Sequence, residues 1–272
     1  MPELPEVEVL KRSLSPHLIG ESFRSIDVLN AALREPASVR SLRRHLKGRE
    51  VTRLRRRSKY LLVDVEGGST LVVHLGMSGR LTLSPEGPPE PHEHVRFGLE
   101  SGPVLRFRDP RRFGLVFALP TASLEADRHF AHLGLEPLEG LDGDELWRLS
   151  RGRKAPVKAF LMDARHVVGV GNIYASEALF RAGVHPKRAA GRISRERWNL
   201  LAEAVVAVLN QAVAEGGTTL NDFADGDGTP GYFQVSLAVY GREGGPCASC
   251  SESVRRIVQS NRSTFYCPGC QR

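Results

Sequence analysis

The chain has 272 residues, which is enough for two domains of ordinary size or for one large one with a buried core. Its hydrophobic content of 41% and charged content of 25% place it among globular proteins. No apolar run approaches the roughly 18 residues of a membrane helix, and the acidic start lacks the basic flank of a signal peptide. These two observations predict a cytosolic protein with no membrane partner. The net charge of +7 favours a polyanionic partner such as nucleic acid.

The amino-terminal stretch MPELPEVEV holds two prolines and three glutamates in its first eight residues. Apolar residues follow at steps of three and four, at Leu4, Val7, Leu10 and Leu14. This spacing predicts a helix with Pro2 and Pro5 at about its first turn, and Pro16 is expected to end or kink it.

Two interpretations of this stretch remain open. Proline and acids favour the first helical turn because proline fixes φ and the helix dipole attracts negative charge. Alternatively, removal of Met1 would free the Pro2 amine as a nucleophile, because an α-amino group titrates near 8 and is far less protonated than lysine at neutral pH. On one helical face with Pro2, Glu3 and Glu6 would then supply proton transfer.

Short β-branched and aromatic runs, separated by turn residues, follow up to about Pro120. Their spacing predicts an antiparallel sandwich or barrel. The expected strands lie within residues 22–29, 59–68, 69–84, 94–101, 103–107 and 113–120.

Between Arg40 and Lys59 there are ten lysines and arginines against one acid, Glu50. A solvated charged face is the commonest reason for such a run. Lys59 differs because it adjoins an expected strand. The segments HLGMSGR and RDPRRFG place Met77, Arg111 and Phe113 on apparent turns. Such residues often belong to a core, but proteins that distort DNA also insert them into the base stack.

From Leu138 to about Ala214 the pattern is mainly helical. Helices are expected within 144–152, 154–163, 173–183 and 194–217. Asn172 is expected to cap the third of them, after glycines 169 and 171. Free amides at such a start bind anions, so the turn resembles a phosphate clamp flanked by cations, namely Arg153, Lys154 and Lys158. A glycine- and aspartate-rich loop, 221–232, then leads to the carboxyl-terminal region.

All four cysteines lie in the last 26 residues, as CASC and CPGC: Cys247, Cys250, Cys267 and Cys270. Two such knuckles can surround one tetrahedral zinc ion, and the absence of a secretory signal argues against disulfides. The intervening 254–267 segment predicts a β-hairpin that presents three arginines, at 255, 256 and 262, to phosphate or simply to solvent.

Several motifs, in this order, resemble the formamidopyrimidine-DNA glycosylase family of repair enzymes for oxidised purines. They are PELPEVE, KYLL, HLGMSG, DPRRFG, LMDARHVVGVGNIYASEALF, GYFQ, VYGREGGPC and the CxxC pair. The resemblance runs from Pro2 to Cys270. It implies an α+β fold with an N-terminal antiparallel β-sandwich (1–130), a helix-two-turns-helix domain (131–235) and a zinc finger (236–272), with damaged duplex DNA bound between domains.

The resemblance also implies roles for individual residues. Pro2 is the expected Schiff-base nucleophile, Glu3 its acid/base partner and Glu6 a support for the same pocket. Lys59 would serve β-elimination, and Arg262 would serve δ-elimination and phosphate binding. The expected wedge consists of Met77, Arg111 and Phe113, with Arg111 facing the orphaned cytosine; further DNA contacts are expected at His74, His92, Arg153 and Asn172, and one structural zinc at the four cysteines.

Two other functions would explain part of these features. An endonuclease VIII-like enzyme for oxidised pyrimidines typically begins PEGPE, whereas Leu4 stands here in place of the glycine. A non-catalytic zinc-ribbon DNA-binding protein explains the charge but has no use for Pro2, Glu3, Glu6 and Lys59 together. Asn221 and Asp222 stand where several relatives carry arginine and threonine, so the preference between 8-oxoguanine and formamidopyrimidines stays open. A monomer is expected.

Overall fold

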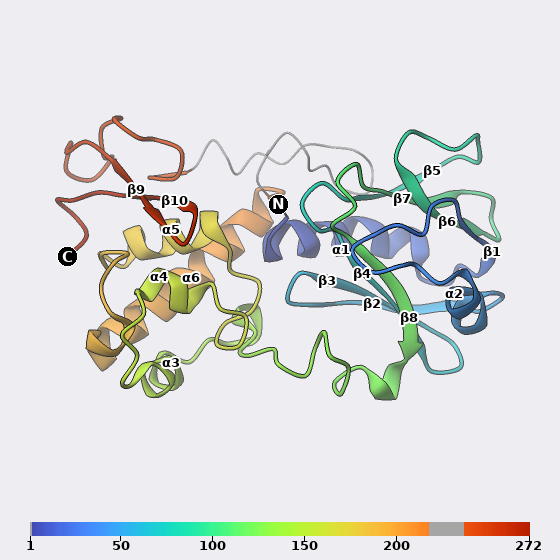
Figure 1. Ribbon diagram of the computed structural model, residues 1–272, viewed down its shortest axis with the longest axis horizontal. Coiled ribbons are helices and arrows are strands. Elements are labelled where there is room, and N and C mark those ends of the chain that lie inside the picture. Colours follow the sequence, from blue (N-terminus) through green and yellow to red (C-terminus); the bar gives the residue numbers. More distant parts are fainter. Residues whose placement is uncertain (1, 218–236) are drawn as a thin grey trace. The chain divides into compact units, whose positions relative to one another are not determined.

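The computed structural model describes residues 2–217 and 237–272 (Figure 1). Its described residues separate into two compact units, one with residues 2–131 and 215–217, the other with 132–214 and 237–272. The predicted loop at 221–232, with Asn221 and Asp222, lies outside the described residues. Across the described part of the chain, no helix is both long and apolar enough to cross a bilayer.

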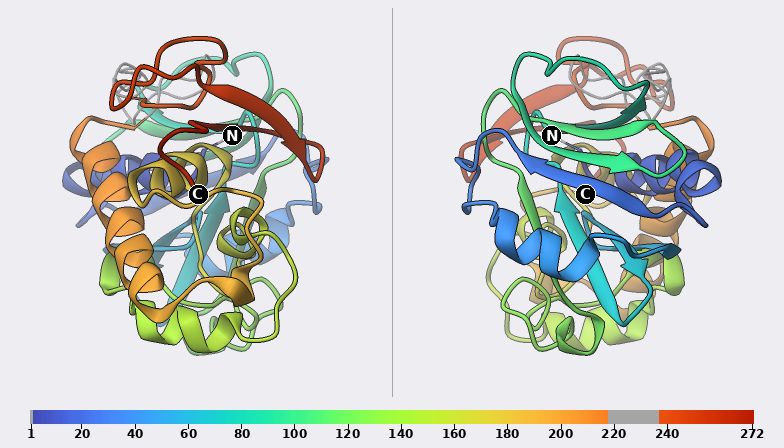
Figure 2. Two further views of the ribbon diagram at one scale, coloured as in Figure 1. Left: turned by 90° about the vertical axis from the view of Figure 1, so that its left-hand side faces the viewer. Right: turned by 90° about the vertical axis from the view of Figure 1, so that its right-hand side faces the viewer.

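The first unit is built on two four-stranded antiparallel sheets, as the sequence predicted. One sheet has the order β1 (Phe23–Val28), β6 (Glu93–Leu99), β7 (Val104–Arg108) and β5 (Arg80–Ser84). The other has the order β2 (Val51–Arg57), β3 (Tyr60–Val65), β4 (Ser69–His74) and β8 (Leu115–Pro120). Side chains of both sheets join one buried apolar cluster, and Figure 2 shows the sheets facing each other in its right-hand view. The predicted β-sandwich is therefore confirmed.

Helix α1 (Leu4–Leu18) supplies Val7, Leu10 and Leu14 to this cluster, which confirms the predicted helix. Its boundaries differ from the prediction. Pro2 precedes the helix because Glu3 is the N-cap residue, and Pro5 alone lies in the first turn. Pro16 does not end the helix, which continues to Leu18.

The basic run from Arg40 to Lys59 contains two elements that its charge concealed. Helix α2 (Val39–Leu46) buries Leu42 and Leu46, and strand β2 buries Val51 and Leu54. Most arginines of these elements are exposed or half-buried, whereas the side chain of Arg56 is only 5% exposed. A period of apolar residues therefore lies within the charged run, and it places the run on the sandwich.

The second unit contains the four predicted helices: α3 (Gly143–Ser150), α4 (Val157–Leu161), α5 (Asn172–Arg181) and α6 (Arg195–Ala214). Short 3-10 turns also occur, η2 (Pro137–Glu139) and η3 (Ala190–Arg192) here and η1 (Thr121–Ser123) in the first unit. Helix α6 contacts both α3 and α5, and Figure 2 shows it in orange in the left-hand view. Trp198 of α6 is fully buried.

A two-stranded ribbon, β9 (Arg255–Gln259) and β10 (Arg262–Tyr266), completes the second unit and confirms the predicted hairpin. Ser260 and Asn261 form its two-residue turn, and both have positive φ, 48° and 59°. This left-handed pair matches the right-handed twist of a hairpin, and asparagine tolerates it well. The turn places Arg262 at the tip of the ribbon.

Candidate active site and nucleic-acid interface

The first turn of α1 gathers the acidic residues that the sequence singled out. The backbone N–H of Glu3 donates to Oε2 of Glu6 at 2.7 Å, and the two residues form a reciprocal capping box. Both side chains are almost fully buried, as is Pro2. Gly217 also packs against this turn, since a Cβ there would lie 3.2 Å from Oε1 of Glu6, and its φ is +81°. The end of the chain that carries Pro2 is thus held in one orientation.

Lys59 lies in the two-residue turn between β2 and β3, after Ser58, whose φ is +55°. Buried Arg56 connects this turn to α1, because its guanidinium donates to Oε2 of Glu8 at 3.1 Å and to the carbonyl of Ser58 at 3.1 Å. Burial opposes ionisation of Glu8, but Lys11 and the arginines around it prevail and hold the pKa of Glu8 below its usual value. Helix and lysine turn are therefore linked by a buried ion pair.

His74, the last residue of β4, is a neutral imidazole. Its Nδ1 accepts the backbone N–H of Gly76 at 3.0 Å, so the proton is on Nε2, and its ring lies 4.8 Å from that of Tyr60. Burial, with the positive charges of Lys59 and Arg34, lowers the pKa of His74 to about 4. At neutral pH this side chain can offer a phosphate one N–H donor but no charge.

This environment makes the stability contribution of His74 depend on pH. The unfolded chain takes up a proton near the ordinary pKa of 6.5, whereas folded His74 resists protonation until about pH 4. The contribution is thus present above pH 6.5 and is lost as pH falls toward 4. As pH falls through this window, denaturant unfolding should show that the free energy of unfolding decreases more for the wild type than for His74→Asn. A difference that stayed constant from pH 7.5 to 4.5 would contradict this assignment.

The expected wedge residues lie on two neighbouring loops of the sandwich. Met77 is in the loop between β4 and β5, and Arg111 and Phe113 are in the loop between β7 and β8. The Arg111 guanidinium carbon lies 4.9 Å from the centre of the Phe113 ring, and Phe113 is 44% exposed. An exposed aromatic side chain stacked by a cation suits insertion between bases.

Two further predicted contacts lie apart from these loops in the sequence. His92 is exposed and has a φ of +63° at the end of the proline-rich segment before β6. Its carbonyl accepts the N–H of Asp109 at 3.0 Å. Arg153 is exposed in the loop after α3, together with Lys154.

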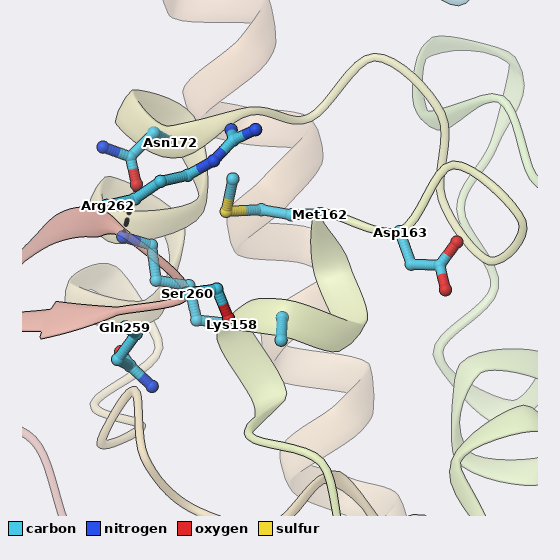
Figure 3. A pocket seen from close by; sticks show the side chains of 8 residues that line it. Lys158, Met162, Asp163, Asn172, Gln259, Ser260 and Arg262 are labelled. Atoms are coloured by element: carbon cyan, nitrogen blue, oxygen red, sulfur yellow. Dashed lines mark hydrogen bonds between the residues drawn. The ribbon is translucent and has the colours of Figure 1, made fainter.

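The prediction that Asn172 caps α5 is wrong. Gly171 is the N-cap, and the Asn172 side chain instead donates from Nδ2 to the carbonyl of Ser263 at 3.0 Å. Its Oδ1 accepts from Nζ of Lys158 at 2.7 Å, which Figure 3 shows as a dashed line. Lys158 also donates to Oγ1 of Thr264 at 2.8 Å and is buried, so its ammonium group binds protein acceptors, whereas the sequence predicts a cation that flanks a phosphate clamp. Both side chains join the helices to the ribbon.

Arg262 borders a cavity of about 210 Å³ within the second unit. Figure 3 shows the labelled side chains around it, which include Lys158, Met162, Asn172 and Gln259. Among the described residues the Arg262 guanidinium has no hydrogen-bonding or ion-pair partner, and it is exposed. A cation held at a hairpin tip beside a cavity is well suited to binding a phosphate.

Glu177 of α5 anchors the segment that begins the ribbon region. Its carboxylate accepts the backbone N–H groups of Ala238, Val239 and Tyr240 at 2.8, 3.0 and 2.8 Å, and the residue is 5% exposed. The two oxygens share these three donors. The position of residues 238–240 thus depends on one buried carboxylate.

Glu177→Gln is expected to lower the free energy of unfolding by about 1–3 kcal/mol, because an amide must turn its NH2 toward a backbone N–H that cannot rotate away. Denaturant unfolding measures this change. Glu203→Gln, at an exposed position of α6, removes the same charge and serves as the control. Equal effects of the two substitutions would contradict the anchoring role.

The four cysteines lie together. Their sulfur atoms are all within 4.8 Å of one another, with 3.9 Å between Cys247 and Cys270 and 3.3 Å between Cys250 and Cys267. Four thiolates at about 2.3 Å from one tetrahedral ion would be about 3.8 Å apart, so the cluster fits a metal ion. None of the four forms a disulfide. The expected metal centre is therefore present as a donor set.

Sequence reasoning missed several residues that hold these groups in place. In the sequence, Arg56 lies within a charged run, Glu8 is one of three glutamates near the amino terminus, and Asp109 belongs to the DPRRFG motif. Glu177 gave a stronger signal, because an acid among the apolar and small residues of IYASEALF stands on a buried helix face. Their partners are distant in sequence, and no local pattern indicates them.

Comparison with family models identifies both units. The formamidopyrimidine-DNA glycosylase N-terminal domain matches residues 1–116, and the formamidopyrimidine-DNA glycosylase H2TH domain matches residues 133–224. Proteins named formamidopyrimidine-DNA glycosylase from Xanthomonas campestris and Marinobacter nauticus are 48% and 49% identical over 274 residues, with full coverage of both chains.

Solved structures agree with these matches. MutM (Fpg) from Thermus thermophilus is 41% identical, with a TM-score of 0.89 over 99% of this chain and 98% of that one. Lactococcus lactis Fpg in complex with a Fapy-dG containing DNA has a TM-score of 0.90 at 28% identity, over 99% and 100%. The same enzyme with an abasic site containing DNA has the same score and identity, over 99% of both chains. This chain belongs to the formamidopyrimidine-DNA glycosylase family.

Proposed function

We propose that this protein is a bifunctional DNA glycosylase and abasic-site lyase of base excision repair that excises oxidised purines, 8-oxoguanine and formamidopyrimidines, from duplex DNA. The observation that carries this proposal is the buried first turn of α1, which holds Glu3 and Glu6 in a capping box directly after Pro2. A full-length family match of 48% identity supports it. A zinc-ribbon DNA-binding protein without catalysis would not need this turn.

The reaction begins once removal of Met1 has freed the secondary amine of Pro2. The Pro2 nitrogen attacks C1′ of the extruded nucleotide, the bond from C1′ to the damaged base breaks, and the base leaves with a proton. Glu3 delivers a proton to O4′ as the sugar ring opens. The resulting iminium has no N–H proton to lose, so it stays cationic and withdraws electrons from the sugar.

Strand cleavage follows from this electron sink. Loss of a proton from C2′ expels the 3′ phosphate (β-elimination), a step that we assign to Lys59. Loss of a second sugar proton expels the 5′ phosphate (δ-elimination), a step that we assign to Arg262, which also binds phosphate. Water then hydrolyses the iminium and regenerates the amine. Glu6 orients Glu3 through the backbone hydrogen bond of 2.7 Å.

The remaining predicted residues bind and deform the DNA. Met77, Arg111 and Phe113 fill the space that the extruded nucleotide leaves, with Arg111 facing the orphaned cytosine. His74 and His92, together with Arg153 and Asn172, contact the sugar-phosphate backbone. Asn172 does so while its side chain also supports the ribbon, so its contribution includes the placement of Arg262.

The four cysteines bind one structural Zn²⁺, which keeps the ribbon folded. We propose that the chain has three domains for this function: a catalytic sandwich (1–130), a helix-two-turns-helix domain (131–235) and a zinc finger (236–272). We further propose that the protein acts as a monomer in the cytoplasm, where its DNA substrate lies.

Borohydride trapping tests the proposal. The purified protein is reduced in the presence of a duplex with 8-oxoguanine opposite cytosine, an undamaged duplex and a duplex with an oxidised pyrimidine, and its amino terminus is read by mass spectrometry. An adduct mapped to Pro2 on the first duplex alone supports the proposal. Trapping only on the oxidised pyrimidine indicates an endonuclease VIII-like activity, and no adduct from protein that lacks Met1 rejects a glycosylase.

A further inference from the structure

The two loops that carry Met77, Arg111 and Phe113 meet at a single buried side chain, the carboxylate of Asp109. Asp109 follows β7, and its exposed fraction is 0%. Neither its charge nor its burial is used by the steps proposed above. A fully buried carboxylate next to an exposed wedge therefore calls for a physical account.

Both oxygens of Asp109 accept hydrogen bonds from these loops. Oδ1 accepts from Oγ of Ser78 at 2.6 Å, and Ser78 is the residue after Met77. Oδ2 accepts from the backbone N–H of Gly114 at 2.7 Å, and Gly114 is the residue after Phe113. The N–H of Arg111 is 3.2 Å from Oγ of Ser78 and 3.3 Å from Oδ1. Each wedge residue thus adjoins or supplies a donor to this carboxylate.

The loops also touch backbone to backbone. A Cβ at Gly76 would lie 2.5 Å from the carbonyl carbon of Phe113, and one at Gly114 would lie 2.9 Å from the carbonyl oxygen of His74. Glycine is needed at Gly76 for its φ of +64° as well. The carbonyl of Asp109 is in turn 2.8 Å from Nε2 of His94, which fixes the backbone beneath the loops.

We infer that Asp109 is a positioning residue for the wedge, holding the Met77 loop and the Arg111–Phe113 loop as one rigid body during nucleotide extrusion. This inference rests on the proposed function, because it concerns how that reaction opens the duplex. Inserting side chains between bases costs unstacking energy, and loops that gave way separately would not transmit that force. Asp109 does not touch the reacting atoms.

The hydrogen-bonding chemistry predicts an order of effects. Asparagine can keep its oxygen toward the fixed N–H of Gly114 and turn its NH2 toward Ser78, whose hydroxyl can rotate to accept. Alanine at 109 retains neither bond and leaves the donors buried without an acceptor. Ser78→Ala removes only the link to the Met77 loop. Activity that needs the wedge should therefore fall in the order wild type, Asp109→Asn, Asp109→Ala.

The test compares two substrates. One is a duplex with 8-oxoguanine opposite cytosine, measured in single-turnover excision. The other is a single-stranded oligonucleotide with an abasic site, which requires the Pro2 chemistry but offers no partner strand to hold apart. Thr70→Ala is the matched control. Thr70, on strand β4, is fully buried, and its hydroxyl also donates to a carboxylate, Oδ1 of Asp64, at 2.7 Å.

Ser78→Ala is expected to slow duplex excision about tenfold and Asp109→Ala about a hundredfold, as one or several hydrogen bonds to a charged group are lost. Cleavage of the single strand should change by less than about twofold in Ser78→Ala, and Thr70→Ala should show no such split between substrates. Asp109→Asn should recover most of the activity that alanine loses. In Ser78→Ala, the rate of 8-oxoguanine excision opposite cytosine should also fall relative to the rate opposite adenine, since Arg111 faces the orphaned cytosine.

The proposal is overturned if Ser78→Ala behaves like Thr70→Ala, or if it slows both substrates equally. Thermal unfolding of every variant accompanies the assays, and if Asp109→Ala does not fold, the comparison of Ser78→Ala with Thr70→Ala decides. Wild-type protein that acts on neither substrate would instead reject the proposed function, which distinguishes that failure from failure of the positioning role.

Discussion

Pro2→Gly is expected to slow release of the damaged base by at least about a hundredfold, because it removes the ring that orients the attacking nitrogen and replaces a secondary amine by a flexible primary one. The capping box of Glu3 and Glu6 is unaffected by this change, since it uses the backbone N–H of Glu3. Single-turnover excision measures the rate, and borohydride trapping measures the covalent intermediate.

Two controls separate the amine from the helix. Pro5→Ala changes the other proline of this stretch, which lies inside the first turn with its nitrogen in a peptide bond, and it should retain the trapped intermediate. An extension that blocks the amino terminus keeps every side chain but should abolish trapping. Full activity of the blocked protein, or of Pro2→Gly, would show that the Pro2 amine is not the nucleophile.

Cys247→Ser is expected to lose the bound metal and most of the affinity for duplex DNA. The ribbon buries few apolar side chains of its own, with Val239, Val254 and Phe265 around the cysteines, so its fold depends on the metal. An unfolded ribbon no longer presents its three arginines, at 255, 256 and 262. The slope of log affinity against log salt should therefore decrease by up to about three, one for each lost phosphate contact.

Ser249→Ala is the matched control for this substitution. Ser249 lies between the two cysteines of the same knuckle, and only its backbone N–H approaches Sγ of Cys247, at 3.4 Å. It should retain one zinc ion per chain and an unchanged salt slope. Metal analysis identifies the ion, and chelation of wild-type protein should reproduce the Cys247→Ser result. A Cys247→Ser protein with full metal content and affinity would refute the assignment.

Local patterns in the sequence were sufficient wherever a structure depends on near neighbours. The helix α1, the strands of the sandwich and the hairpin between the two CxxC knuckles were all predictable for this reason. The cluster of four cysteines was predictable because the chemistry of four thiolates restricts what they can bind. Helix α2 and strand β2 were not predicted, because the many arginines of this run made it resemble a solvated charged face although it includes the buried residues Leu42 and Leu54.

Only the tertiary structure decided which polar side chains are buried and what satisfies them. Asn172 had the right residue type and place for a helix cap, but its amide is used across 91 residues by Ser263. Asp109 and Ser78 are 31 residues apart, and Arg56 and Glu8 are 48 apart. A buried charge must find partners wherever the fold brings donors together, so these contacts follow from topology and not from local sequence. The amino acid sequence therefore determined the chemistry of this protein, and the fold determined how that chemistry is held in place.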